Sequence, residues 1–233
     1  MAAVTALWRH PIKSHGREPL ETVALTAGQT MPWDRHWAVT HEASKFQPDA
    51  PAWEKCRNFM IGSQNPGVAG IWSSLNEDTG LMTLRHSAAD EISFDPATAK
   101  GQAAFLAWVK PLYPADKRTA QAIVTAAPRG MTDTPEPTIS IMNTASHAAI
   151  EDYFGHPVSA ERWRGNIWID GLTAWAELEL IGKTLRIGSA ELAITAPCVR
   201  CMATAASPQT GVRDLDTLGA LRDGWDHQNF GIY

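Results

Sequence analysis

Two cysteines stand three positions apart in the segment Ala196–Thr204, and they are the residues of this chain best suited to do chemistry. Cys198 and Cys201 could be half of a zinc site, but the second ligand pair that structural zinc requires is missing. A redox Cys-x-x-Cys pair usually opens a helix after a strand, whereas small and β-branched residues flank this one. One thiolate could instead bind a soft metal, because the charge of Arg200 favours the ionised thiol. Two buried structural cysteines are the fourth interpretation.

Three short segments carry basic residues in settings that suit an anionic ligand. Lys13 and Ser14 lie where they could contact an anion, although a solvated lysine is the commoner outcome. Arg35 lies between tryptophans, and a partly buried arginine needs a carboxylate or phosphate partner, a role that a neighbouring acid would also fill. Arg162 and Arg164, two positions apart, face the same side of a strand and could clamp an anion or line a surface. Each segment is thus compatible with an anion contact and equally with an ordinary surface or ion-pair role.

Composition and missing motifs exclude several functional classes. The 233 residues are 44% hydrophobic and 19% charged, which is typical of a globular chain with one or two domains. A net charge of −5 disfavours nucleic-acid binding, and no apolar run is long enough to span a membrane. The cysteine usage and a start that does not resemble a signal peptide predict a cytoplasmic protein. A phosphate-binding glycine loop, a serine nucleophile elbow and a His-Glu-x-x-His zinc helix are all missing from the sequence.

Short β-prone runs separated by turns must position these residues. Asn76–Gly80 predicts a hairpin turn, and Asn143 with Thr144 predicts the start of a helix that Gly155 stops. The expected strands cover 4–8, 20–25, 37–40, 67–75, 81–84, 121–126, 139–142, 185–187 and 192–194, and the expected helices lie after 95–96, over 144–154 and over 215–221. The predicted fold class is therefore β-rich α+β, a barrel or sandwich with few peripheral helices. A domain boundary is expected within residues 96–137.

Five segments, taken together and in order, resemble the MOSC superfamily, named for the C-terminal domain of molybdenum cofactor sulfurase. They look closest to bacterial relatives of the mitochondrial amidoxime-reducing component. The segments similar to the family's motifs are His10-Pro-Ile-Lys-Ser14, Asp34-Arg-His-Trp-Ala-Val39, Arg162-Trp-Arg-Gly-Asn-Ile167, Cys198-Val-Arg-Cys201 with Thr204 and Pro208-Gln-Thr-Gly211, and Phe230-Gly-Ile-Tyr233. The chain departs from the family pattern at Ala205 and Ser207, where relatives have Thr and Asp. Relatives also continue beyond Tyr233, so the last barrel strand is expected to be missing or supplied by an earlier segment.

The resemblance implies a fold and a cofactor. The fold would be an N-terminal MOSC-type β-barrel domain over residues 1–95, packed and interlocked with a MOSC β-barrel domain over 96–233. The cofactor would be a molybdenum cofactor of the molybdopterin type, with Cys201 as the metal ligand and catalytic residue. The cofactor-binding residues carried over by position are Lys13, Ser14, Arg35, Asn143, Thr144, Arg164, Asn166, Arg200, Thr204 and Tyr233. Because the cofactor carries a phosphate, charge-assisted hydrogen bonds from the basic members of this set are expected.

The activity implied by the resemblance is the reduction of small N-hydroxylated compounds, such as amidoximes, hydroxylamines and N-hydroxylated bases, to amines. A separate electron-transfer reductase would then be the partner of this chain. An alternative of a different class is a non-catalytic carrier of the molybdenum cofactor or of its sulfur. A carrier should bind the cofactor without turnover, so artificial electron donors would separate the two. A structural β domain without a cofactor is the third interpretation.

Overall fold

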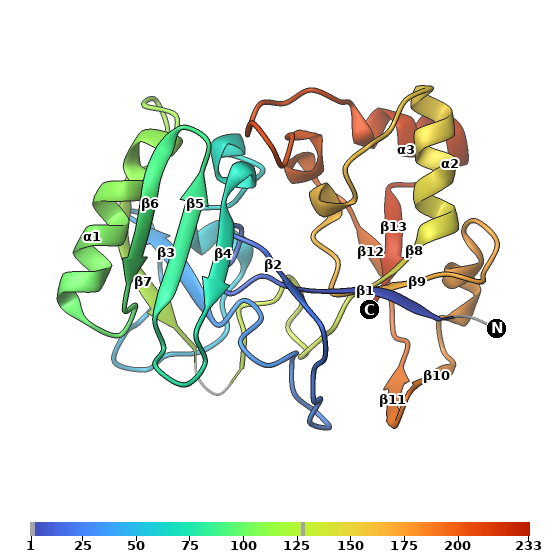
Figure 1. Cartoon of the computed structure of the whole chain (residues 1–233), viewed down its shortest axis with the longest axis horizontal. Coiled ribbons are helices and arrows are strands. Elements are labelled where there is room, and N and C mark those ends of the chain that lie inside the picture. The colour runs from blue at the N-terminus through green and yellow to red at the C-terminus, as the bar shows by residue number, and fades with distance from the viewer. Residues whose placement is uncertain (1–2, 127–128) are drawn as a thin grey trace.

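Short strands dominate the computed structural model, which describes residues 3–126 and 129–233 and has two lobes (Figure 1). The strands and helices, in chain order, are β1 (Val4–Arg9), β2 (Glu18–Leu20), β3 (Trp37–His41), β4 (Trp72–Leu75), β5 (Met82–His86), β6 (Ala89–Phe94), α1 (Ala99–Val109), β7 (Ala120–Thr125), β8 (Ile141–Asn143), α2 (Thr144–Phe154), β9 (Ile167–Ile169), β10 (Thr184–Ile187), β11 (Ala190–Ala193), β12 (Pro197–Val199), α3 (Thr217–Trp225) and β13 (Asn229–Ile232). This arrangement confirms the predicted β-rich class with few helices.

The left-hand lobe in Figure 1 is built from two antiparallel sheets and helix α1. Strands β4, β5 and β6 form one sheet, and β3 pairs with β7 to form the other. The predicted turn between β4 and β5 is confirmed: the side chain of Asn76 accepts the N–H groups of Asp78 and Thr79, and Gly80 takes a φ of 73°. Helix α1 packs against β6 and β7 and adds Phe105 to the buried core.

The right-hand lobe contains a six-stranded sheet in the order β12-β13-β8-β9-β1-β2. Strands β8 and β9 are parallel and α2 lies in the connection between them, while the other pairs are antiparallel. Helix α2 begins at the Asn143 cap and ends at Gly155 with a φ of 71°, as predicted. Within the predicted 20–25 run, only Leu20 is in a strand, because β2 pairs with β1 over Glu18–Leu20 alone.

Strand β1 carries the N-terminal segment into the sheet of the right-hand lobe, where it pairs with β9. The chain then returns to this sheet through β2 and continues to β3 in the left-hand lobe, so residues 10–36 connect the two lobes. The pairings within 3–126 and 129–233 leave each sheet open, so no closed barrel is formed over these residues. The predicted boundary after residue 95 stays a prediction.

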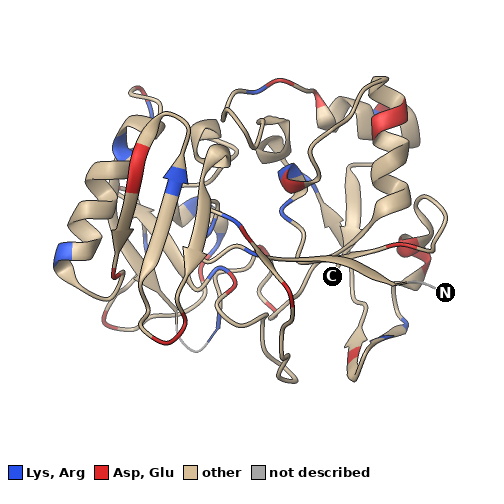
Figure 2. Ribbon diagram, viewed as in Figure 1, with Lys and Arg blue, Asp and Glu red and all other residues tan. Residues whose placement is uncertain are grey.

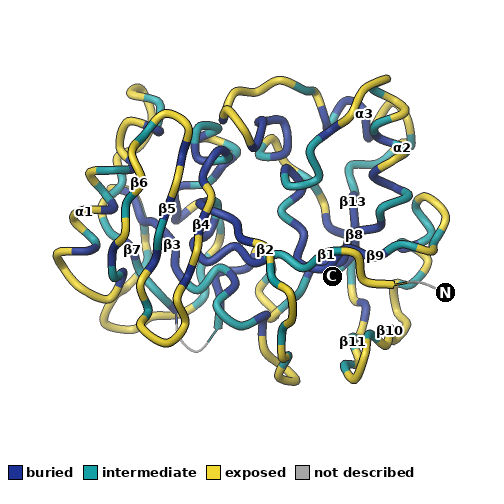
Figure 3. The backbone as a smooth tube through the Cα atoms, in the orientation of Figure 1, coloured by how far each residue is buried: buried dark blue, intermediate teal, exposed yellow. Residues whose placement is uncertain are grey.

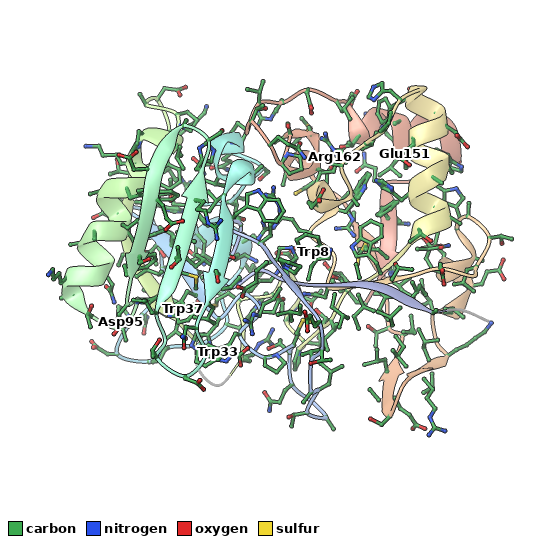
Figure 4. All side chains as sticks on the ribbon, viewed as in Figure 1. Trp8, Trp33, Trp37, Asp95, Glu151 and Arg162 are labelled. Atoms are coloured by element: carbon green, nitrogen blue, oxygen red, sulfur yellow. The ribbon has the colours of Figure 1, made fainter. Side chains whose placement is uncertain are left out.

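Each lobe has its own buried centre, drawn dark blue in Figure 3. In the right-hand lobe, Trp163 stacks on Phe230 with ring centroids 4.1 Å apart. In the left-hand lobe, Trp33 stacks on Trp37 at 5.7 Å, and both side chains are labelled in Figure 4. Burial of such large aromatic surfaces fixes the segments next to them, among them the segments that carry Arg35 and Arg164.

Candidate functional site

A cavity of about 310 Å³ receives side chains from both lobes. Most of the predicted site residues line it: Lys13, Ser14, Arg35, Arg164, Arg200, Cys201, Thr204 and Tyr233. Lys and Arg positions lie on both sides of the region between the lobes in Figure 2. The cavity therefore joins a thiol to a concentration of positive charge, although the chain as a whole is acidic.

The two cysteines of the 198–201 segment lie in different environments. Cys198 is in strand β12 and is buried in the core of the right-hand lobe, where burial raises its pKa to about 11. Cys201 follows the strand, is exposed and lines the cavity. Among residues 3–126 and 129–233, no group of three or more His, Cys, Asp or Glu side chains could hold a metal ion. Of these two thiols, that of Cys201 is therefore the one at the cavity.

The turn that carries Cys201 is held by its neighbours. Thr204 donates from Oγ1 to the carbonyl of Cys201 at 3.0 Å, and its hydroxyl also contacts that of Thr217 at 2.6 Å. Arg200 is half-buried and donates to the carbonyls of Trp163 (2.8 Å) and Phe230 (2.8 Å). Both side chains thus fix the backbone around the thiol, and this fixed position is what a metal ligand needs.

Arg162 adds a second support for this turn from the right-hand lobe, where Figure 4 labels it. Its buried guanidinium donates to the carbonyls of Thr204 (2.9 Å) and Ala206 (3.3 Å). It also forms an ion pair with Asp214 at 3.2 Å. Of the two arginines in this segment, Arg162 is therefore the one paired with a carboxylate, although its Nε finds no partner among the described residues.

Arg164 differs from Arg162 because no carboxylate of the described residues forms an ion pair with it, and one of its terminal N–H groups is buried without a partner. Nη1 donates to the carbonyl of Gly16 at 3.1 Å, but Nη2 has no hydrogen-bond partner among the described residues. Burial, together with the nearby charges of Arg35 and Arg17, lowers the pKa of Arg164 to about 9. Asp34 and Asp133 offset only part of this lowering, and an anion in the cavity would favour the charged form of Arg164 further.

Arg35 and Lys13 complete the positive side of the cavity. Arg35 forms an ion pair with buried Asp34 and donates from Nη2 to the carbonyl of Arg164 at 3.0 Å. Although burial opposes it, the charge of Arg35 holds the pKa of Asp34 well below its usual range. Lys13 is almost fully buried, and its ammonium group contacts Asp133 at 2.5 Å.

Three residues that line the cavity have left-handed backbone conformations. The φ values are 65° at Ser14, 50° at Arg35 and 51° at Arg164. This region is uncommon for residues other than glycine and costs about 1–3 kcal/mol per residue. Strain at several positions around one cavity indicates that the chain is shaped there for a ligand.

Three of the predicted residues do not line the cavity. Asn143 caps α2 through its side-chain oxygen and donates from Nδ2 to buried Glu177 at 2.8 Å, and Thr144 is the next residue of the helix. Asn166 ties the sheet together, since its Oδ1 accepts from Ser140 and its Nδ2 donates to the carbonyl of Trp8. Asn143 and Asn166 position the chain around the site.

Cys56 and Asp133 are among the cavity-lining residues that the sequence did not reveal as site residues. The thiol of Cys56 donates to Asp133 at 3.3 Å. Both lie in segments without strand or α-helix, and they are 77 positions apart. The unpaired Cys56 was the one visible signal, but nothing in the local pattern connects it with Cys201.

Two family models match this chain in succession. The model described as the MOSC N-terminal beta barrel domain matches residues 1–120, and the one described as the MOSC domain matches 128–233. The chain therefore belongs to the MOSC family, a family related to molybdenum cofactor sulfurase and associated with molybdenum cofactor binding. No curated protein matches the chain. None of the helices over the described ranges is long and apolar enough to cross a membrane.

Proposed function

We propose that this chain binds a molybdenum cofactor through Cys201 and reduces small N-hydroxylated compounds to amines. The observation that carries the proposal is the cavity itself, in which the exposed thiol of Cys201 shares a wall with Arg164, whose Nη2 is buried without a partner among the described residues. A thiolate is a soft ligand that suits molybdenum held by sulfur, and a cation with a free donor suits a phosphate.

The residues present fit such a cofactor. Nη2 of Arg164 and the indole Nε1 of Trp163 are buried donors that find no acceptor within the described residues, and both side chains line the cavity. A phosphate has enough oxygens to accept from both and from the Ser14 hydroxyl. Cys201 lies in the same cavity, so one ligand could contact the thiol and the donors together.

When bound, the cofactor would supply a two-electron metal centre that acts as a Lewis acid and electron store. The chain's part is to hold that centre at a fixed place: Cys201 provides the thiolate, while Thr204 and Arg200 hold its backbone through the bonds described above. Reduction of R–NH–OH to R–NH2 and water consumes two electrons and two protons. A separate electron-transfer reductase would supply the electrons, and solvent can supply the protons because Cys201 is exposed.

The test is elemental analysis and pterin fluorescence on protein made in a host supplied with molybdate. The wild type is compared with Cys201→Ala, and Cys198→Ala is the matched control because its thiol is buried in the core. We expect about one molybdenum per chain in the wild type and in the control, and none in Cys201→Ala. Equal metal content in all three would contradict the role of Cys201. Retained cofactor without turnover of an amidoxime by artificial electron donors would favour a carrier.

A further inference from the structure

Lys13 is placed to bind an anion in the cavity, yet its donors are already used. Its Nζ lies 2.8 Å from the carbonyl of Met131, 3.4 Å from that of Thr132 and 2.5 Å from Oδ1 of Asp133. A lysine ammonium group has three N–H donors, so these three acceptors account for all of them. An anion that enters the cavity can use Lys13 only after one of the acceptors leaves.

Asp133 is the acceptor that can leave. Its side chain is about half exposed, at 54%, whereas the other two acceptors are backbone carbonyls. Although removal from water opposes ionisation, the charges of Lys13 and Arg35 hold the pKa of Asp133 well below its usual range. Asp133 is therefore a carboxylate at the position where a ligand's anionic group would meet these two cations.

The backbone that carries Asp133 is held independently of its carboxylate. Arg129 donates to the Thr132 hydroxyl at 2.7 Å and to the carbonyl of Thr134 at 3.1 Å, and Trp53 donates to the carbonyl of Thr132 at 2.9 Å. The segment therefore keeps its place when the Asp133 side chain rotates. Rotation of an exposed side chain is fast and needs no unfolding of the segment.

We infer that Asp133 is an internal anion that competes with the ligand for Lys13, so that the cavity accepts a phosphate monoester dianion and rejects singly charged carboxylates. When a singly charged carboxylate displaces Asp133 from Lys13, one carboxylate contact replaces another, so the net gain in binding free energy is small. A dianion gains a second charge interaction, and it also reaches the free Nη2 of Arg164. Asp133 would thus act as a repulsive group that a singly charged carboxylate cannot displace, and such groups are a general source of binding specificity.

This inference rests on the proposed function, because the anion would occupy the same cavity as the cofactor's phosphate. The test uses inorganic phosphate and acetate as probes, titrated calorimetrically into the wild type and Asp133→Asn at about pH 8, where phosphate is mainly a dianion. Asp116→Asn is the matched control, since Asp116 is 76% exposed, does not line this cavity and loses the same charge.

We expect the wild type to bind phosphate but not acetate. Asp133→Asn should bind phosphate about tenfold more tightly and should also bind acetate. The factor of ten corresponds to a wild type in which Asp133 is away from Lys13, and the site is free to bind, about a tenth of the time. Asp116→Asn should match the wild type. Weaker or unchanged phosphate binding in Asp133→Asn would show that Asp133 only holds Lys13 in place, and would overturn the inference.

A crystal structure with phosphate provides the second measurement. We expect the Asp133 carboxylate to have left Nζ of Lys13, and an intact pair beside bound phosphate would overturn the inference. These assays contain no molybdenum. Selective phosphate binding in a protein that retains no metal would therefore refute the proposed function alone, whereas an absence of phosphate binding to the wild type and to Asp133→Asn would refute the inference.

Discussion

Replacing Arg164 by methionine should stabilise the protein and abolish its response to anions. The pKa of Arg164 falls from its usual 12.5 to about 9 through burial and the charges of Arg35 and Arg17. At about 1.4 kcal/mol per pKa unit, keeping this group charged at neutral pH costs the fold up to about 5 kcal/mol. Arg164→Met removes this cost but also loses the hydrogen bond to the carbonyl of Gly16, which reduces the gain in stability by about 2 kcal/mol. Methionine keeps the length of the side chain and a similar left-handed backbone cost.

We therefore expect the free energy of unfolding of Arg164→Met to exceed that of the wild type by up to about 3 kcal/mol, which corresponds to a rise in Tm of at most about 6–12 °C. Arg162→Met is the matched control, because it removes a buried arginine whose charge is satisfied by Asp214 and by backbone carbonyls. That control should lose about 1–3 kcal/mol. Added phosphate should raise the Tm of the wild type, through binding to the folded state, and leave that of Arg164→Met unchanged.

The pH dependence of this difference follows from the sign of the shift. Because the folded pKa of Arg164 lies below its unfolded value, the cost is fully present below about pH 9 and disappears as the pH rises from there towards 12.5. The stability advantage of Arg164→Met should therefore be constant near neutral pH and shrink only above about pH 9. A variant that unfolds as readily as Arg162→Met would refute the reasoning, since Arg164 would then be a structural residue with a satisfied charge.

Two further predictions concern the turn at Cys201 and the buried imidazole behind Arg35. Thr204→Val removes the bonds to the Cys201 carbonyl and to Thr217, so we expect a loss of about 1–2 kcal/mol and several-fold lower molybdenum retention, whereas Thr217→Val should lower stability alone. Burial and the charge of Arg164 lower the pKa of His10 to about 3, so its contribution to stability is present above about pH 6.5 and is lost as the pH falls towards 3. Buried His15, with its pKa lowered to about 4, adds to the loss in both proteins, so urea unfolding at about pH 7 and pH 5 should show a loss about 2 kcal/mol larger in the wild type than in His10→Gln.

Local sequence patterns predicted the elements that local chemistry decides. Asn143 and Gly155 set the ends of α2 through a side-chain cap and a left-handed glycine, and Asn76–Gly80 set the turn of a hairpin. The helix cap and the hairpin turn each depend on residues a few positions apart, so both can be recognised from the sequence alone. The pairing of β1 with β9 joins residues more than 150 positions apart, and the local pattern of either strand does not contain it.

For the site, the resemblance located the segments but could not separate residues that face the cavity from residues that support it. Arg164 and Asn166 stand two positions apart in one motif, yet Arg164 lines the cavity and Asn166 bonds to Ser140 and Trp8. The left-handed conformation of Arg164 turns the chain between them, which breaks the alternation expected of a strand. Asp133 escaped prediction because its role depends on Lys13, 120 positions away.

The strain and the unpaired charge of the cavity explain how a ligand could bind there with little rearrangement. The backbone at Arg35 is fixed on both sides, since its N–H donates to the carbonyl of His10 at 2.7 Å and its carbonyl accepts from Met131 at 2.7 Å. Lys13 is fixed in the same way by a 2.7 Å bond from its N–H to the carbonyl of Trp37. The cost of holding cations together is thus met during folding, and an entering dianion recovers it. Rotation of the Asp133 carboxylate is the main movement that this geometry still requires.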